Sequence, residues 1–259
     1  SELILERQRR AMRGGRPRLG ERWIGGQVSY HLSEGTLTEP MSRFFHRLLI
    51  MRDSLLSLEA ALVASVDHGP QAPSIAAARM AVTCGLGLNG AMGTAVHMLD
   101  DLHGGAGEQL VEWLYRLAEN GPDGDLASQI TAYQAGVNRF IPGFGHRFHK
   151  PVDPRAPRLM SLVGEARDNG LVSGRFMELA LSIERHLAVL KGKPVPMNID
   201  GATAVIFAEL GFAPPLARGL FCLSRSVGAM AHGHEQMQQG GRNKGPTPPH
   251  YRWRYAGNE

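Results

Sequence analysis

Apolar residues recur at mixed spacings of three and four along most of the chain, as in amphipathic helices. The clearest set predicts a helix over residues 176–190, with Ser173 before it as an N-cap. A second set predicts a helix over about 157–169, which ends at an Asn-Gly pair suited to a helix C-terminus. A third set lies between positions 44 and 62. The pattern predicts a mostly helical protein.

Two segments depart from this pattern. Residues 28–32 alternate apolar and polar side chains between glycines, which predicts at most a short hairpin near the N-terminus. Residues 80–99 carry no charge, but they include four glycines, an asparagine and a histidine. Such a run favours a central packed helix or a subunit interface over a membrane span, because small residues let another backbone approach closely.

The charge of the chain is concentrated at its N-terminus. The net charge is +4, and residues 1–22 hold seven arginines against three glutamates, which already accounts for that value. The rest of the chain is balanced, so a nucleic-acid-binding face is not favoured, and we interpret the arm as a solvated or partner-clasping tail. Only two cysteines occur, Cys84 and Cys222, without metal or redox spacing. We therefore expect a cytoplasmic protein with no membrane span and no disulfide framework.

Three loops rich in glycine or proline also carry histidine, arginine or aspartate, over residues 100–109, 142–155 and 193–201. His103 and His146 each adjoin glycines that would let a ligand approach the backbone, and Asp200 precedes a glycine. Two imidazoles and a carboxylate suit general acid and base catalysis at carbon. Spacing alone leaves another interpretation open, in which Asp200 caps a helix and the histidines are hydrogen-bonded loop residues. No histidine spacing fits a metal site, so we expect no metal.

Five segments occur in one order between about residues 60 and 240: VDHGPQAPS, LHGGAGE, PGFGHRFHKPVDPR, NIDG and LFCLSRSVGAMAH. In this order they resemble the active-site motifs of the citrate synthase superfamily. The DHGP and DLHGGAGE forms are closer to its citryl-CoA lyase branch, including the citryl-CoA lyase module of ATP-citrate lyase.

The resemblance implies an all-α, citrate synthase-like fold with the active site in a cleft between two helical domains. The large domain would comprise residues 26–103 and 206–259, the small domain residues 104–205, and residues 1–25 would form the basic arm. It also implies a homodimer in which each site is completed in trans by the partner.

By the same resemblance, Asp200 is the acid/base at the acetyl methyl carbon, and His103 is a neutral donor to the thioester oxygen. His146 would contact the oxaloacetate carbonyl or citryl hydroxyl. If both histidines are neutral donors, burial and nearby N–H groups should lower their pKa values. Acyl-CoA would be a substrate, with no permanently bound cofactor. The residues that would bind substrate carboxylates are His68, Arg155, Arg225, Arg242 and Lys244, and those that would bind CoA are Gly143, Phe144, Gly145 and Arg147.

Several alternatives remain open within this family. Arg242 and Lys244 lie in GRNKGP, where citrate synthases have an arginine before a proline, and one carboxylate contact could be missing. The small Gly201 beside Asp200 could admit a different acyl group or keto acid. The leading hypothesis is a lyase that cleaves citryl-CoA to acetyl-CoA and oxaloacetate. The alternatives are a synthase of citrate or a 2-methylcitrate-like acid, and a non-catalytic homologue that binds CoA or carboxylates.

Overall fold

The computed structural model describes residues 55–119, 125–146 and 151–243. Except for the first two residues of its first helix, the described part belongs to one compact unit, Ser57–Glu259. In these ranges there is no β-strand, only isolated bridges, which confirms the predicted all-α class. The helices are α4 (Leu55–Ser65), α5 (Pro73–Thr83), α6 (Leu88–His97), α7 (Ala106–Glu119), α8 (Leu126–Gly136), α9 (Arg155–Asp168), α10 (Arg175–Lys191), α11 (Ile199–Glu209) and α12 (Pro214–Gln239).

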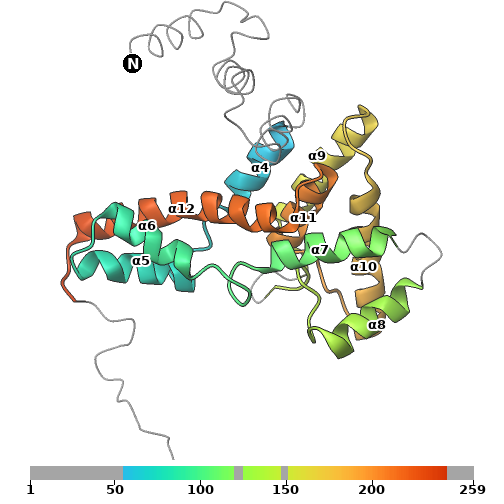
Figure 1. Cartoon of the computed structure of the whole chain (residues 1–259), viewed down its shortest axis with the longest axis horizontal. Coiled ribbons are helices and arrows are strands. Elements are labelled where there is room, and N and C mark those ends of the chain that lie inside the picture. Colours follow the sequence, from blue (N-terminus) through green and yellow to red (C-terminus); the bar gives the residue numbers. More distant parts are fainter. Residues whose placement is uncertain (1–54, 120–124, 147–150, 244–259) are drawn as a thin grey trace, which may run out of the picture. The chain divides into compact units, whose positions relative to one another are not determined.

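Two groups of helices share the long helix α12 (Figure 1). In the first group, α5, α6 and α12 pack on one another through buried small residues, among them Ala78, Ala95 and Ala229. In the second group, α7, α9 and α10 pack against α11, and α12 also contacts α7. Every residue of α11 from Gly201 to Ala208 is buried, because its sequence is apolar or small on all faces. The first turn of this core helix carries Asp200.

The predicted helices over 157–169 and 176–190 are confirmed as α9 and α10. The N-cap of α10, however, is Gly174 in the left-handed region (φ 73°) and not Ser173. The carboxylate of Glu209 accepts the N–H groups of Gly174, Phe176 and Met177. The Ser173 hydroxyl accepts the N–H of Arg175 (3.1 Å), so Ser173 and a residue of α11 share the donors at the start of α10.

The prediction of one helix over residues 80–99 is wrong, because α5 ends at Thr83 and α6 begins at Leu88. Gly85 has φ 97°, and the N–H groups of Gly85 and Leu86 donate to the carbonyls of Val82 and Ala81. This pairing is the Schellman motif that ends helices at glycine.

The remaining sequence predictions concern a membrane span, two N-terminal elements and the division into domains. No helix in the described ranges is long and apolar enough to cross a membrane. The hairpin over 28–32 and most of the helix predicted between 44 and 62 lie outside the described residues. The division into a large and a small domain stays a prediction.

Candidate functional site

Two of the glycine-rich loops lie against each other at the start of α11. Residues 143–145 run antiparallel to residues 196–198, with a bridge between Phe144 and Met197. Three hydrogen bonds join them: Gly145 N–H to the Pro196 carbonyl (2.7 Å), Asn198 N–H to the Gly143 carbonyl (2.9 Å), and the Asn198 side-chain amide to the Gly145 carbonyl (2.8 Å). This pairing fixes the loop that carries His146 beside the helix turn that carries Asp200.

Two glycines make this close contact possible. A Cβ built on Gly201 would lie 2.3 Å from the Gly143 carbonyl oxygen, and one built on Gly143 would lie 2.7 Å from the Gly201 Cα. Gly143 also has φ 80°, a conformation that glycine adopts without strain. The space beside Gly201 is therefore filled by the Gly143 backbone. This packing corrects the expectation that the small Gly201 enlarges a substrate pocket.

Asp200 lies in the first turn of α11 but does not cap it. The N-cap is Asn198, whose Oδ1 accepts the N–H groups of Asp200 (3.0 Å) and Gly201 (3.1 Å). Burial raises the pKa of the Asp200 carboxyl above its ordinary value, and Asp153 adds to this effect. The positive charges of Arg225 and Arg155 oppose it. The helix-cap interpretation of Asp200 is thus wrong, and the residue is partly buried among charged side chains.

His103 is held in one tautomer by α5. Its Nε2 accepts the backbone N–H of Ser74 (3.2 Å) and lies 2.9 Å from the Ser74 hydroxyl oxygen. A ring nitrogen that accepts a backbone N–H carries no proton, so the imidazole is neutral and its proton is on Nδ1. Burial, followed by the positive charge of Arg225 and the neighbouring His68, lowers the pKa of His103. The predicted lowering is confirmed for this residue.

Arg225 lies in α12 and is almost fully buried. Its guanidinium lies 4.8 Å above the centroid of the Phe221 ring, and its Nε donates to the Ser65 carbonyl (3.2 Å). Its charge acts on both Asp200 and His103, as does His68. Predicted residues from four of the five motifs therefore lie close enough for their charges to affect one another: His68, His103, Asp200 and Arg225.

His146, from the third motif, lies next to His68. Their ring centroids are 5.3 Å apart and the ring planes meet at 57°. This contact joins the DHGP and GFGH motifs, which are almost eighty residues apart in the sequence.

Arg155 lies at the start of α9 with a partner that sequence reasoning missed. Its Nε and Nη2 donate to the two carboxylate oxygens of Asp153, at 3.0 and 2.8 Å. Asp153 is fully buried and also accepts the Ile199 N–H (3.1 Å), next to Asp200. The sequence DPR places Asp153 just before a helix start, and this position is the signal that could have identified Asp153 as a partner of Arg155.

Asp67 precedes His68 and is held by a chain of side chains that the sequence did not reveal. Its Oδ1 lies 3.1 Å from His232 Nε2, and His232 Nδ1 lies 3.3 Å from Arg79 Nη1. Burial alone would raise the pKa of Asp67, but the hydrogen bonds of His232 and of the His68 and Gly69 N–H groups lower it. The His68 loop is thereby tied to α5 and α12.

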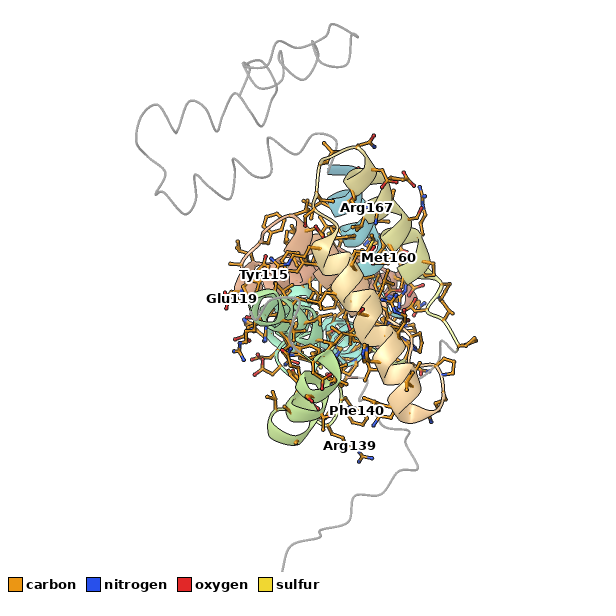
Figure 2. All side chains as sticks on the ribbon, turned by 90° about the vertical axis from the view of Figure 1, so that its right-hand side faces the viewer. Tyr115, Glu119, Arg139, Phe140, Met160 and Arg167 are labelled. Atoms are coloured by element: carbon orange, nitrogen blue, oxygen red, sulfur yellow. The ribbon has the colours of Figure 1, made fainter. Side chains whose placement is uncertain are left out.

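The other predicted residues are less closely connected to these groups. Phe144 is buried, and Arg242 is exposed just beyond the end of α12. Arg147 and Lys244 lie outside the described residues. Arg139 and Phe140, before the GFGH motif, are exposed, with the Arg139 guanidinium 5.5 Å from the Phe140 ring centroid (Figure 2). In the described ranges, no group of three His, Cys, Asp or Glu side chains is arranged to hold a metal ion.

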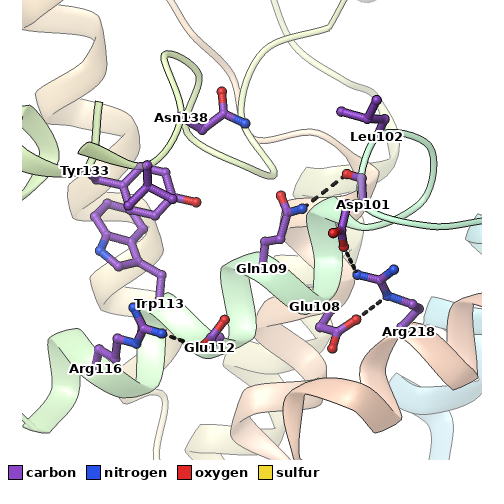
Figure 3. Close-up of a pocket in the computed structure, with 11 residues that line it drawn as sticks. Asp101, Leu102, Glu108, Gln109, Glu112, Trp113, Arg116, Tyr133, Asn138 and Arg218 are labelled. Carbon is purple, nitrogen blue, oxygen red and sulfur yellow. Dashed lines mark hydrogen bonds and ion pairs between the residues drawn. The ribbon is translucent and has the colours of Figure 1, made fainter. Parts of the chain in front are cut away.

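A pocket of about 450 Å³ lies beside the His103 loop, between α7 and the end of α8 (Figure 3). None of the predicted catalytic residues lines it. Its two arginines are paired with carboxylates, Arg218 with Asp101 and Glu108, and Arg116 with Glu112. Neither arginine is therefore available to a phosphate without giving up its partner. The lining residues are Asp101, Leu102, Glu108, Gln109, Glu112, Trp113, Arg116, Tyr133, Val137, Asn138 and Arg218.

Comparisons with known proteins agree with the motifs. Residues 30–253 match the family model "Citrate synthase, C-terminal domain". A citrate synthase of Acidithiobacillus ferridurans is 31% identical over 155 residues, which cover 58% of this chain and 38% of that protein. The chain thus spans well under two thirds of that relative's length.

Solved structures show the same fold. The citryl-CoA lyase from Hydrogenobacter thermophilus superposes with a TM-score of 0.70 and 29% identity, covering 80% of this chain and 78% of that one. The citrate synthase from Thermotoga maritima gives a TM-score of 0.64 and 26% identity, covering 83% and 56%. The family match covers most of the chain, and the fold and the motif order agree with it, so this chain belongs to the citrate synthase family.

Proposed function

We propose that the protein is an enzyme that cleaves citryl-CoA to acetyl-CoA and oxaloacetate. The observation that carries the proposal is that a neutral His103, protonated on Nδ1, and an Asp200 of raised pKa both lie within the influence of Arg225 and His68. Cleavage needs a hydrogen-bond donor at the thioester oxygen and a proton source at the departing carbon. The neutral imidazole of His103 suits the first role, and a raised pKa favours proton delivery by the Asp200 carboxyl group.

The reaction can be assigned to named groups. A base, proposed as His146, takes the proton of the citryl hydroxyl, and the bond between the hydroxyl-bearing carbon and the acetyl methylene carbon breaks. The hydroxyl carbon becomes the carbonyl of oxaloacetate, and the bonding electrons pass into the acetyl-CoA enolate. The Nδ1–H of His103 stabilises the enolate oxygen, and Asp200 delivers its proton to the methylene carbon. Proton transfer from His146 back to Asp200, directly or through solvent, restores the starting state.

Buried charges near these groups suit a substrate with several carboxylates. Arg225 and Arg155 both act on Asp200, and a guanidinium can bind a carboxylate through two parallel hydrogen bonds. Two nitrogens of Arg155 already bind Asp153, so we assign the two-point contact to Arg225. His68 contacts His146 and belongs to the proposed carboxylate-binding set. Leu102, fully exposed next to His103, and the exposed Phe140 offer apolar contacts for the long arm of a thioester.

We also propose that two copies associate through α12. Five apolar side chains on this helix are exposed at spacings of seven, four, three and seven residues, which places them on one face: Leu216, Leu223, Val227, Met230 and Met237. An apolar face of this kind is typical of an interface between subunits. Arg242, close to the end of the same helix, would then be able to reach the site of the partner. Light scattering should give the mass of a dimer for the wild type and of a monomer for Leu223→Glu/Val227→Glu.

A synthase of citrate or of a related acid is the second candidate, since the A. ferridurans relative is a citrate synthase. A synthase must also hydrolyse the citryl thioester. The test gives the purified protein citryl-CoA and measures oxaloacetate with malate dehydrogenase and NADH, together with free CoA. Oxaloacetate with little free CoA supports the lyase, whereas citrate and free CoA with little oxaloacetate support the synthase. If neither product set forms, the non-catalytic homologue is favoured.

A further inference from the structure

The loop that carries His103 is a tight turn with an exposed tip. The N–H of Asp100 donates to the His103 carbonyl (2.9 Å), and the N–H of His103 donates to the Asp100 carbonyl (3.1 Å). Asp101 and Leu102 therefore form the tip of the turn, and their side chains are exposed. The backbone holds the turn closed, but these two bonds do not connect it to the rest of the protein.

One arginine adds three connections to those made by Ser74 and Gln109. Arg218, in the second turn of α12, uses its three nitrogens on three different carboxylates. Its Nε donates to Glu108 and its Nη2 to Asp101, both drawn in Figure 3, and its Nη1 donates to Asp100. The Arg218 side chain is only 20% exposed, whereas those of Asp100 and Asp101 are 82% and 74% exposed. A guanidinium presents its donors in a fixed plane, so it can fix the relative positions of the groups that it binds.

Arg218 lies on the same helix as Arg225, a residue of the proposed site. Arg225 follows Arg218 by seven residues, which is two turns along the same face of α12. Glu108 is in the first turn of α7, and the Gln109 side-chain amide donates to the Asp101 carbonyl (3.1 Å). Arg218 therefore ties the His103 loop to two helices at once, and one of them carries Arg225.

We propose that Arg218 is a positioning residue that aims the Nδ1–H of His103 into the active site by holding Asp100 and Asp101. The inference rests on the proposed function for its effect on catalysis. Its effect on the environment of His103 does not depend on any reaction, so the two can be tested separately.

The experiment compares three variants by steady-state citryl-CoA cleavage and by NMR titration of the His103 imidazole, whose resonance is assigned by its loss in His103→Gln. Arg218→Gln removes the anchor. Asp100→Ala/Asp101→Ala removes the two carboxylates that Arg218 binds on the loop, at exposed positions where folding is least affected. Arg116→Gln is the matched control, because this arginine lines the same pocket but pairs only with Glu112 on its own helix.

We expect Arg218→Gln and the double variant to lower kcat between about 10- and 100-fold with a smaller change in KM, because a misplaced donor weakens the transition state. Both should also raise the pKa of His103 toward its ordinary value, as the loosened loop exposes it to water. Arg116→Gln should match the wild type.

The direction in which the pKa of His103 changes in the double variant distinguishes a positioning role of Arg218 from a simple effect of charge. Removing two negative charges would by itself lower the pKa of His103, whereas loosening the loop raises it. An unchanged or lowered pKa of His103 in the folded double variant, together with wild-type kcat, would overturn the inference. If the wild type does not cleave citryl-CoA, the proposed function fails, and the titration still tests the role of Arg218.

Discussion

The buried pair of Asp153 and Arg155 allows a stability prediction that can be worked out from the structure. In Asp153→Asn one oxygen remains to accept the Arg155 bonds to Oδ1. The other becomes an NH₂ group that faces two donors, Arg155 Nη2 and the Ile199 N–H, which both lie within 3.1 Å of Oδ2. Each hydrogen bond to a charged group contributes about 1.5–3 kcal/mol. The two lost bonds predict a loss of about 3–6 kcal/mol in the free energy of unfolding, close to the range of about 3–5 kcal/mol found when one partner of a buried pair is removed.

The assay is urea denaturation at fixed protein concentration, followed by circular dichroism. Asp168→Asn is the matched control, because Asp168 also pairs with an arginine, Arg167, but the two side chains are 70% and 40% exposed. Its loss should be below about 1 kcal/mol, as for surface pairs. If Asp153→Asn and Asp168→Asn had the same midpoint and slope, Asp153 would not hold the loop to α11 as we infer.

Three further predictions follow from the same contacts. Gly201→Ala should lower the free energy of unfolding by about 1–3 kcal/mol in thermal denaturation, because its Cβ would meet the Gly143 carbonyl. Gly164→Ala, in the open part of α9, is the control and should be neutral or stabilising. Equal effects of the two substitutions would contradict the loop packing. Glu209→Gln should destabilise the protein by about 1–2 kcal/mol, because a neutral amide caps the α10 N–H groups less well, and hydrogen exchange should quicken at the start of α10. The third concerns pH: the raised pKa of Asp200 favours the folded state only where the carboxyl is protonated, so its contribution is present at acid pH and is lost as pH rises through the folded pKa. Asp200→Asn should thus be more stable than the wild type at pH about 7, with a gap that closes toward the ordinary aspartate pKa of about 3.9. The lowered pKa of His103 has the opposite pH dependence. Its contribution to the free energy of unfolding, measured against His103→Gln, should be present above about pH 6.5 and be lost as pH falls through the folded pKa. Urea titrations at several pH values measure both contributions, and a gap that does not change with pH would contradict these assignments.

The sequence predicted what depends on local pattern and motif order. The helical class, the positions of α9 and α10, and the chemistry expected of His103 and Asp200 follow from periodicity and from residue types in ordered motifs. Three features were not predicted from these patterns, and the last two depend on contacts between distant segments. The break at Gly85 depends on a left-handed turn, the cap of α10 depends on Glu209 from another helix, and the partners of Asp153 come from two helix starts. Arg218 lies more than one hundred residues from the loop that it holds.

Asp200→Asn tests the central claim most directly. The variant keeps the size of the side chain and both backbone hydrogen bonds to Asn198, so it should fold and bind citryl-CoA, which isothermal titration can verify. Without a proton to deliver, it should form oxaloacetate from citryl-CoA at least about 100-fold more slowly than the wild type. A folded Asp200→Asn protein that cleaves citryl-CoA at the wild-type rate would contradict the assignment of Asp200 and the mechanism built on it.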